Sequence, residues 1–307
     1  MEKLSFVFRK SRGIGDLIQD YLTLFRRIFR HFNRTVFQFL LPFLALFILI
    51  VFFSSSLGVD FFNNAALKDA TVITVIAGLA ILVSLIFFLF IPTFGIEYMF
   101  LLEERDACDF TAKAVWQRLR AHLGKYFVFF WAALLVMLVL LIPLILIYLV
   151  LAFIPFIGAI AMGIAGACLT AFYYCALFLY ITGRERLFGS FPAAFRLIKQ
   201  KLFVYGIAAY IFQWLSQVVL GLLTLIPIII MVVIAYNTIG FNEKIFVSFG
   251  GKMLLSLAST LFMAFITISA VYLVSFYTLI FFSSLEDTYQ EGTIGIIDQI
   301  GDTQNEL

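Results

Sequence analysis

Charged residues are scarce in this chain of 307 residues, where Asp, Glu, Lys and Arg together make up 13% of the sequence. A soluble domain usually carries about 25% charged residues. Hydrophobic residues account for 64%, and so little polar material cannot cover the surface of a water-soluble globule. The composition therefore excludes a soluble enzyme and predicts a protein that resides in a membrane.

Cysteine and histidine are also rare, with three and two residues respectively. Cys108 lies in a polar segment, Cys168 and Cys175 lie in an apolar one, and no C-x-x-C spacing occurs. We expect three free thiols, and His31 and His122 are too few for a typical zinc site. The sequence has no nucleophile with a matching base, no glycine-rich phosphate loop and no hydrolase motif. It thus predicts no metal, no cofactor and no enzymatic activity, and it gives no support for nucleic-acid binding.

Long apolar runs are the main feature that is present. A transmembrane helix needs about 20 apolar residues, and continuous runs favour helices because barrel strands alternate apolar and polar residues. We expect an all-α integral membrane protein with six transmembrane helices. The predicted spans are residues 36–57, 71–102, 126–152, 158–182, 203–235 and 252–284.

Lysine and arginine are distributed unevenly between the segments that connect these spans. Eighteen of the 21 basic residues precede the first span or lie in the loops 103–125 and 183–202. Only Lys68, Lys244 and Lys252 lie on the other side. Because basic loops stay in the cytoplasm, the pattern predicts that both termini are cytoplasmic.

The three basic segments resemble one another. Each has an aromatic residue, an aliphatic residue three positions later and an apolar residue four positions further on, which is the spacing of one helix face. We therefore expect three repeats, at about 14–102, 103–182 and 183–284, each a basic amphipathic cytoplasmic helix followed by a two-span hairpin. The three columns hold Phe25, Trp116 and Phe195; Ile28, Leu119 and Ile198; and Phe32, Leu123 and Leu202.

The cations of these helices form a candidate lipid site. A basic amphipathic helix can lie at a membrane surface, with its apolar face at the acyl boundary and its cations on anionic headgroups. The same cations could instead only enforce topology, or could form a face that docks a partner. His31 and His122 share the repeat position of Lys201, which favours a cationic or interfacial role. The candidate headgroup residues are Arg26, Arg27, Arg30, Arg118, Arg120, Lys199 and Lys201.

Few polar residues lie inside the predicted spans. Glu97 is the only acid within an apolar run, and Gln213 and Gln217 stand one turn apart in the fifth span. An intramembrane carboxylate is often functional, although Glu97 is near the cytoplasmic end, where it could reach the interface or pair with Arg105. Polar side chains between membrane helices also commonly hold the helices together. These three residues are the candidates for a polar site within the membrane.

Small residues recur every four positions in the fourth span, at Ala159, Gly163, Ala167 and Ala171. Such a stripe lets helices approach closely, so it predicts a packing face, with the seam of a homo-oligomer as the alternative.

Residues 285–307 differ from the rest because they contain acidic residues and no Lys or Arg. We expect an acidic cytoplasmic tail that follows the membrane domain, 1–284, and packs beneath the basic helices. A solvated terminus is the alternative.

The sequence resembles a group of bacterial membrane proteins. The resemblance is carried by F-F-S-S-L-E at 281–286, E-G-T at 291–293, I-D-Q-I-G at 297–301 and the loop at 191–202. These residues are similar to those of the membrane domain found beside some glycerophosphodiester phosphodiesterases, and to related stand-alone proteins. The resemblance implies a six-span fold in the bacterial cytoplasmic (inner) membrane. It implies no activity, because this chain has no phosphodiesterase domain.

The sequence is compatible with two functions. The first is a non-enzymatic scaffold or subunit of an envelope complex, which contacts anionic lipid and other membrane proteins. The alternative is a small-molecule or lipid transporter with a polar site near Glu97, Gln213 and Gln217.

Overall fold

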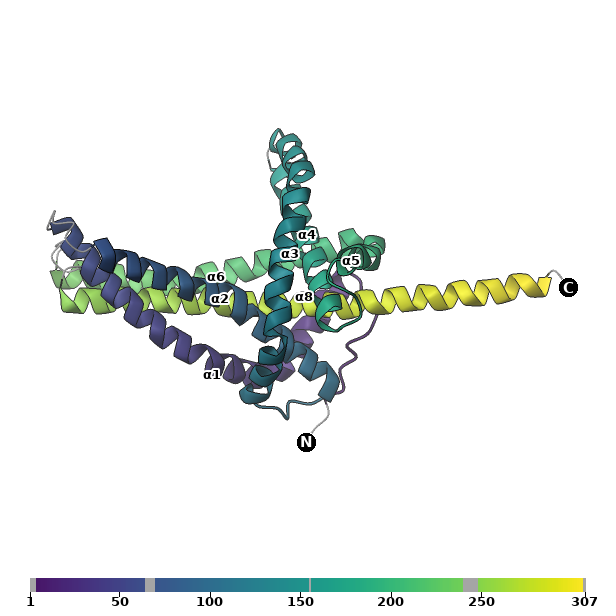
Figure 1. The fold of residues 1–307 in the computed structure, drawn as a ribbon, viewed down its shortest axis with the longest axis horizontal. Coiled ribbons are helices and arrows are strands. Elements are labelled where there is room, and N and C mark those ends of the chain that lie inside the picture. Colours follow the sequence, from purple (N-terminus) through teal and green to yellow (C-terminus); the bar gives the residue numbers. More distant parts are fainter. Residues whose placement is uncertain (1–3, 64–69, 155, 240–247, 306–307) are drawn as a thin grey trace. The chain divides into compact units, whose positions relative to one another are not determined.

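The structure is a computed structural model, and it describes residues 4–63, 70–154, 156–239 and 248–305. Within these ranges the chain forms helices and no β-strand. A 3-10 turn, η2 (Lys199–Lys201), connects α5 to α6. The helices, labelled in Figure 1, are α1 (Ile14–Asn63), α2 (Ala70–Arg105), α3 (Ala112–Ala152), α4 (Ile157–Ile181), α5 (Ser190–Ile198), α6 (Leu202–Ile239) and α8 (Phe249–Asn305).

Several of these helices are long and apolar enough to cross a membrane. In the described part of the chain, five segments meet both conditions, and α2, with 36 residues, covers the remaining predicted span, 71–102. The prediction of an all-α protein with several membrane-crossing helices is therefore confirmed. The five segments are Ile14–Phe53, Ala112–Ala152, Ile157–Ile181, Ser190–Leu225 and Phe249–Tyr289.

The first two basic segments are continuous with the spans that follow them. The sequence predicted a separate cytoplasmic helix before each hairpin, but α1 has 50 residues and α3 has 41. At 1.5 Å per residue, α1 is about 75 Å long, well beyond the bilayer core of about 30 Å. A Gly or Pro between the last arginine and the predicted span could end such a helix. None occurs there in α1, and the single Gly124 in α3 does not interrupt that helix. Of the three basic segments, which all lie within the described residues, only the third is separated from its span by a break, at η2.

The helix α8 also does not end at residue 285, where the acidic tail was predicted to begin. It contains 57 residues and continues through this position to Asn305.

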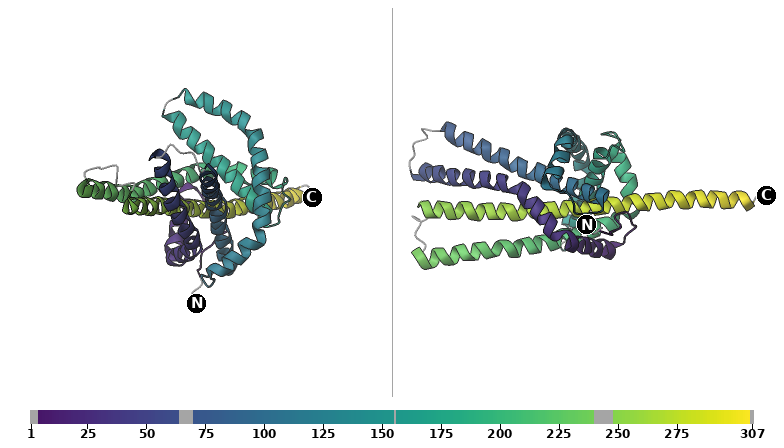
Figure 2. Two further views of the ribbon diagram at one scale, coloured as in Figure 1. Left: turned by 60° about the vertical axis from the view of Figure 1, so that its left-hand side comes forward. Right: turned by 90° about the horizontal axis from the view of Figure 1, so that it is seen from below.

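The chain divides into two compact units. The first unit contains residues 1–29, 96–214 and 273–307, and the second contains residues 30–95 and 215–272. In the second unit, segments of α1, α2, α6 and α8 lie side by side (Figure 2). Phe39 stacks on Phe94 with ring centroids 4.2 Å apart, which joins α1 to α2 within this unit.

In the first unit, α3 lies beside α4, and α4 also packs against α5. Small residues bring α4 close to α6. A Cβ on Gly163 would lie 2.2 Å from a ring carbon of Tyr210, and a Cβ on Gly206 would lie 2.1 Å from Sγ of Cys168. Glycine therefore permits the close approach at both points, because a Cβ there would force the facing side chain to move.

The small-residue stripe of the fourth span belongs to this packing face. Ala167 and Ala171 are buried and Gly163 receives the ring of Tyr210, whereas Ala159 is exposed. The packing interpretation is thus confirmed for three of the four residues.

Candidate functional site

The aliphatic column of the three repeats lies inside the protein. Ile28 is 2% exposed, and Leu119 and Ile198 are 0% exposed. On α1 the same face continues with buried Leu17 and Leu24. An interfacial helix would turn this apolar face toward acyl chains, but here the face packs against neighbouring helices. The lipid-facing interpretation of this column is therefore wrong, since burial within the protein already accounts for its apolar residues.

Most of the candidate headgroup cations lie on the surface of these helices. Arg27 donates from Nη1 to the backbone oxygen of Leu4 at 2.8 Å and is nevertheless exposed. Trp116 and Phe195, of the aromatic column, are 38% and 54% exposed. The surface thus combines cations with aromatic rings, which is the composition of a membrane-interface helix. The exposed candidates are Arg26, Arg27, Arg30, Arg120 and Lys199.

The remaining arginine of the set, Arg118, points inward to Glu97. Its Nε donates to Oε2 of Glu97 at 2.8 Å, and its Nη1 also donates to Glu104. The guanidinium carbon lies 6.0 Å from the ring centroid of Phe100. Arg118 is therefore held between two carboxylates and an aromatic ring.

Glu97 is completely buried and receives two further contacts on its other oxygen. Oε1 accepts from the hydroxyl of Tyr126 at 2.8 Å and lies 2.8 Å from Nδ1 of His122. Arg118, His122 and Tyr126 follow one another at four-residue intervals, so α3 presents all three from one face. We call Glu97 and these three residues the first clamp. It joins the end of α2 to the start of α3.

Arg105, one of the two alternatives considered for Glu97, is not its partner. Arg105 instead lies 3.4 Å from Asp109, four residues further along the chain. A buried carboxylate costs several kcal/mol unless charge and hydrogen bonds compensate it. Three contacts from α3 supply that compensation here.

A second carboxylate is held in the same way. Lys201 donates from Nζ to Oδ1 of Asp287 at 2.7 Å, and the hydroxyl of Tyr205 donates to Oδ2. Asp287 is buried and lies on α8. We call these three residues the second clamp. It removes Lys201 from the set of outward-facing cations, as the first clamp removes Arg118.

The two clamps occupy equivalent positions in the repeat. His122 and Lys201 each follow the buried aliphatic column by three residues, and Tyr126 and Tyr205 follow it by seven. The alignment of the three repeats identified the shared position of His122 and Lys201. It also places Tyr126 and Tyr205 at one position, which the sequence analysis missed. Asp287 was recognised only as one acid of the tail. Thr35 takes the tyrosine position in the first repeat, where it is also buried.

Comparisons with family models, curated proteins and solved structures found no match to this chain.

Gln213 and Gln217, the other two candidates for a polar site within the membrane, are not part of the first clamp. The side-chain contacts of Glu97 all come from α3, so Gln213 of α6 is not among them. Gln213 is half-buried, and Gln217 is exposed in the second unit. The side-chain contacts of Glu97 therefore lie within the pair formed by α2 and α3.

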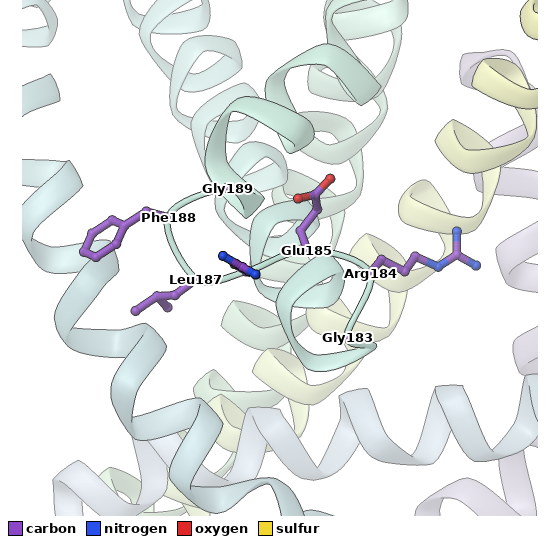
Figure 3. A pocket seen from close by; sticks show the side chains of 7 residues that line it. Gly183, Arg184, Glu185, Leu187, Phe188 and Gly189 are labelled. Atoms are coloured by element: carbon purple, nitrogen blue, oxygen red, sulfur yellow. The ribbon is translucent and has the colours of Figure 1, made fainter.

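A surface pocket lies in the loop Gly183–Gly189 between α4 and α5. Figure 3 shows that the side chains of Arg184, Glu185 and Phe188 point in different directions from this loop. They do not converge on a common point where a ligand could sit. Within the described ranges, no group of three or more His, Cys, Asp or Glu residues is placed to hold a metal ion.

Proposed function

We propose that this protein is a multi-pass scaffold of the bacterial inner membrane, or a subunit of an envelope complex, whose basic helices contact anionic lipid headgroups. The observation that carries the proposal is the separation of the candidate cations into two groups. Arg118 and Lys201 hold buried carboxylates. The other five cations are exposed.

The equivalence of the three basic segments supports this proposal. The same aliphatic column is buried in each, and exposed cations accompany it in each. Three basic surfaces on one side of the membrane fit the anionic cytoplasmic leaflet, where each Lys or Arg near the surface contributes about 1 kcal/mol to lipid attraction. The proposed orientation therefore has both termini in the cytoplasm, as the basic-residue distribution indicates.

The transporter is not proposed, since no observation favours it over the scaffold. Glu97 is enclosed by its contacts with α3. In a scaffold such a group serves to fix helices, which is the usual role of polar side chains between membrane helices.

The test compares two triple variants that each remove three positive charges. Arg26→Gln/Arg120→Gln/Lys199→Gln alters the proposed lipid surface, and Lys68→Gln/Lys244→Gln/Lys252→Gln alters the opposite side. Native mass spectrometry then measures the retention of phosphatidylglycerol against phosphatidylcholine of the same chain length.

We expect the first triple variant to lose at least tenfold in apparent affinity for phosphatidylglycerol, because three cations of about 1 kcal/mol each are removed. The second should bind as the natural sequence does. Equal behaviour of the two variants would reject the proposed lipid surface. The scaffold role requires, in addition, a protein partner of fixed stoichiometry when the chain is extracted gently from its own membrane.

A further inference from the structure

The segment that precedes α1 is not helical and contacts the ends of several helices in the first unit. The backbone nitrogen of Leu4 donates to the backbone oxygen of Asp106 at 2.8 Å. Arg9 lies 2.9 Å from Glu103, on α2. Phe8 is buried, and its ring lies 5.7 Å from that of Phe282, on α8. We call residues 4–13 the strap.

Arg12 holds the strap in its folded form. Its side chain is buried, with the residue 1% exposed, and Nη1 donates to the backbone oxygen of Phe8 at 2.7 Å. Nη2 donates to the backbone oxygen of Val7, and Nε donates to Asp20 at 2.8 Å. An arginine that satisfies several backbone carbonyls can fix a segment that has no regular secondary structure.

The strap also reaches two of the candidate headgroup cations. Arg27 donates to the backbone oxygen of Leu4, and Lys201 donates from Nζ to Oγ of Ser11, both at 2.8 Å. Lys201 is bonded to Asp287 at the same time. A lipid phosphate that approached either cation would compete with contacts that the strap provides.

The cations within the strap are themselves paired with acids of the same unit. Arg9 is paired with Glu103, and Lys10 and Arg12 both lie within 4 Å of Asp20, at 3.7 Å and 2.8 Å. A basic arm that binds lipid would present its cations without such partners. These acids offset the charge of the strap, although the side chains of Arg9 and Lys10 are 51% and 54% exposed.

We infer that the strap restrains the binding of anionic headgroups, by holding Arg27 and Lys201 and by keeping its own cations in internal ion pairs. This inference rests on the proposed lipid-binding function and adds its regulation. Release of the strap makes Arg9, Lys10, Arg12 and Arg27 available together and removes one of the two partners of Lys201. Release therefore strengthens binding to anionic lipid.

The experiment releases the strap without changing its charge. Phe8→Ala removes the ring that packs on Phe282, and Val7→Ala is the matched control, because Val7 is the neighbouring residue and is 64% exposed. Hydrogen exchange of residues 4–13 reports whether the strap is released. Native mass spectrometry of the full-length chain measures its affinity for phosphatidylglycerol and for phosphatidylcholine.

We expect Phe8→Ala to bind phosphatidylglycerol about fivefold more tightly or better, since one additional cation at the surface already accounts for that factor. Val7→Ala and all binding to phosphatidylcholine should be unchanged. Faster exchange in the strap with unchanged or weaker phosphatidylglycerol binding overturns the inference, even if the natural sequence prefers that lipid.

Where Phe8→Ala leaves the exchange of residues 4–13 unaltered, Phe6→Ala/Phe8→Ala takes its place, because Phe6 packs on Phe8 and lies beneath Arg12. The proposed function fails separately, if neither the natural sequence nor any strap variant distinguishes phosphatidylglycerol from phosphatidylcholine.

Discussion

Tyr126 and Tyr205 occupy the same position in two repeats, and each donates its hydroxyl to a buried carboxylate from another long helix. Tyr126 contacts Glu97 of α2, and Tyr205 contacts Asp287 of α8. This shared contact links the repeat in the sequence to an arrangement in space. It gives the basic segments a structural role besides any contact with lipid.

Replacing either tyrosine by phenylalanine should destabilise the protein by about 1.5–3 kcal/mol, because a carboxylate loses a hydrogen bond that burial makes costly to lose. The measurement is thermal unfolding in detergent of Tyr126→Phe and Tyr205→Phe. Tyr173→Phe is the control, since the Tyr173 hydroxyl has only a sulfur contact at 3.6 Å, with Met137. A control shift as large as that of Tyr126→Phe would contradict the first clamp.

Neutralising either of the two carboxylates that contact Arg118 should lower the stability of the protein, but by different amounts. Glu97→Gln leaves a half-buried arginine facing a neutral amide, and breaking a buried pair typically costs about 3–5 kcal/mol. Glu104 is exposed, so Glu104→Gln should cost at most about 1 kcal/mol. Unfolding in the same detergent measures both variants, and the prediction is wrong if their stabilities agree.

Two glycines of α6 should respond in opposite directions to alanine. At Gly206 a Cβ would lie 2.1 Å from Sγ of Cys168, whereas at Gly221 it would have no atom within 4 Å. Gly206→Ala should therefore destabilise by about 1–3 kcal/mol through overpacking. Gly221→Ala should stabilise by up to about 1 kcal/mol, because alanine is the better helix former. Thermal unfolding gives the sign of each change.

Cys108 allows a direct test of orientation, because it lies between α2 and α3 and is partly exposed. In a Cys168→Ser/Cys175→Ser variant, a membrane-impermeant maleimide should label Cys108 in inverted membrane vesicles and not in right-side-out ones. The opposite result would reverse the proposed topology.

Burial raises the pKa of the Cys108 thiol above its ordinary value. The thiolate is the reactive form, so labelling should be slow at neutral pH and should still increase above the pH at which an exposed thiol is fully ionised. A free cysteine in the same buffer provides the reference curve. A labelling profile that matches this reference would show that the thiol is not buried.

The helices were predictable from the sequence because apolar runs of this length have few other solutions in a membrane. Whether a given helix face meets lipid or protein was less predictable. Spacing identified Ile28, Leu119 and Ile198 as one column, but it could not distinguish a face that meets lipid from one that meets protein. Both environments select apolar residues, and only burial separates them.

The partners of Glu97 show why contacts of polar residues are hard to predict from sequence. Proximity along the chain suggested Arg105 as one alternative, whereas the partner is Arg118, 21 residues away. The choice depends on where α3 begins and which face it turns to α2, and neither can be read from nearby residues. Asp287 and Tyr205, separated by 82 residues, are still further beyond sequence patterns.

The carboxylate is synthesised before its hydrogen-bond donors in the first clamp and after them in the second. Glu97 leaves the ribosome before all of its partners, and Tyr126 follows it 29 residues later. At about 5–20 residues per second, the carboxylate waits a few seconds for its donors while α2 is already being inserted. Asp287 emerges after Lys201 and Tyr205, so there the donors wait for the acid. During synthesis, therefore, the first clamp begins as a carboxylate without its donors, and the second begins as a lysine and a tyrosine without their carboxylate.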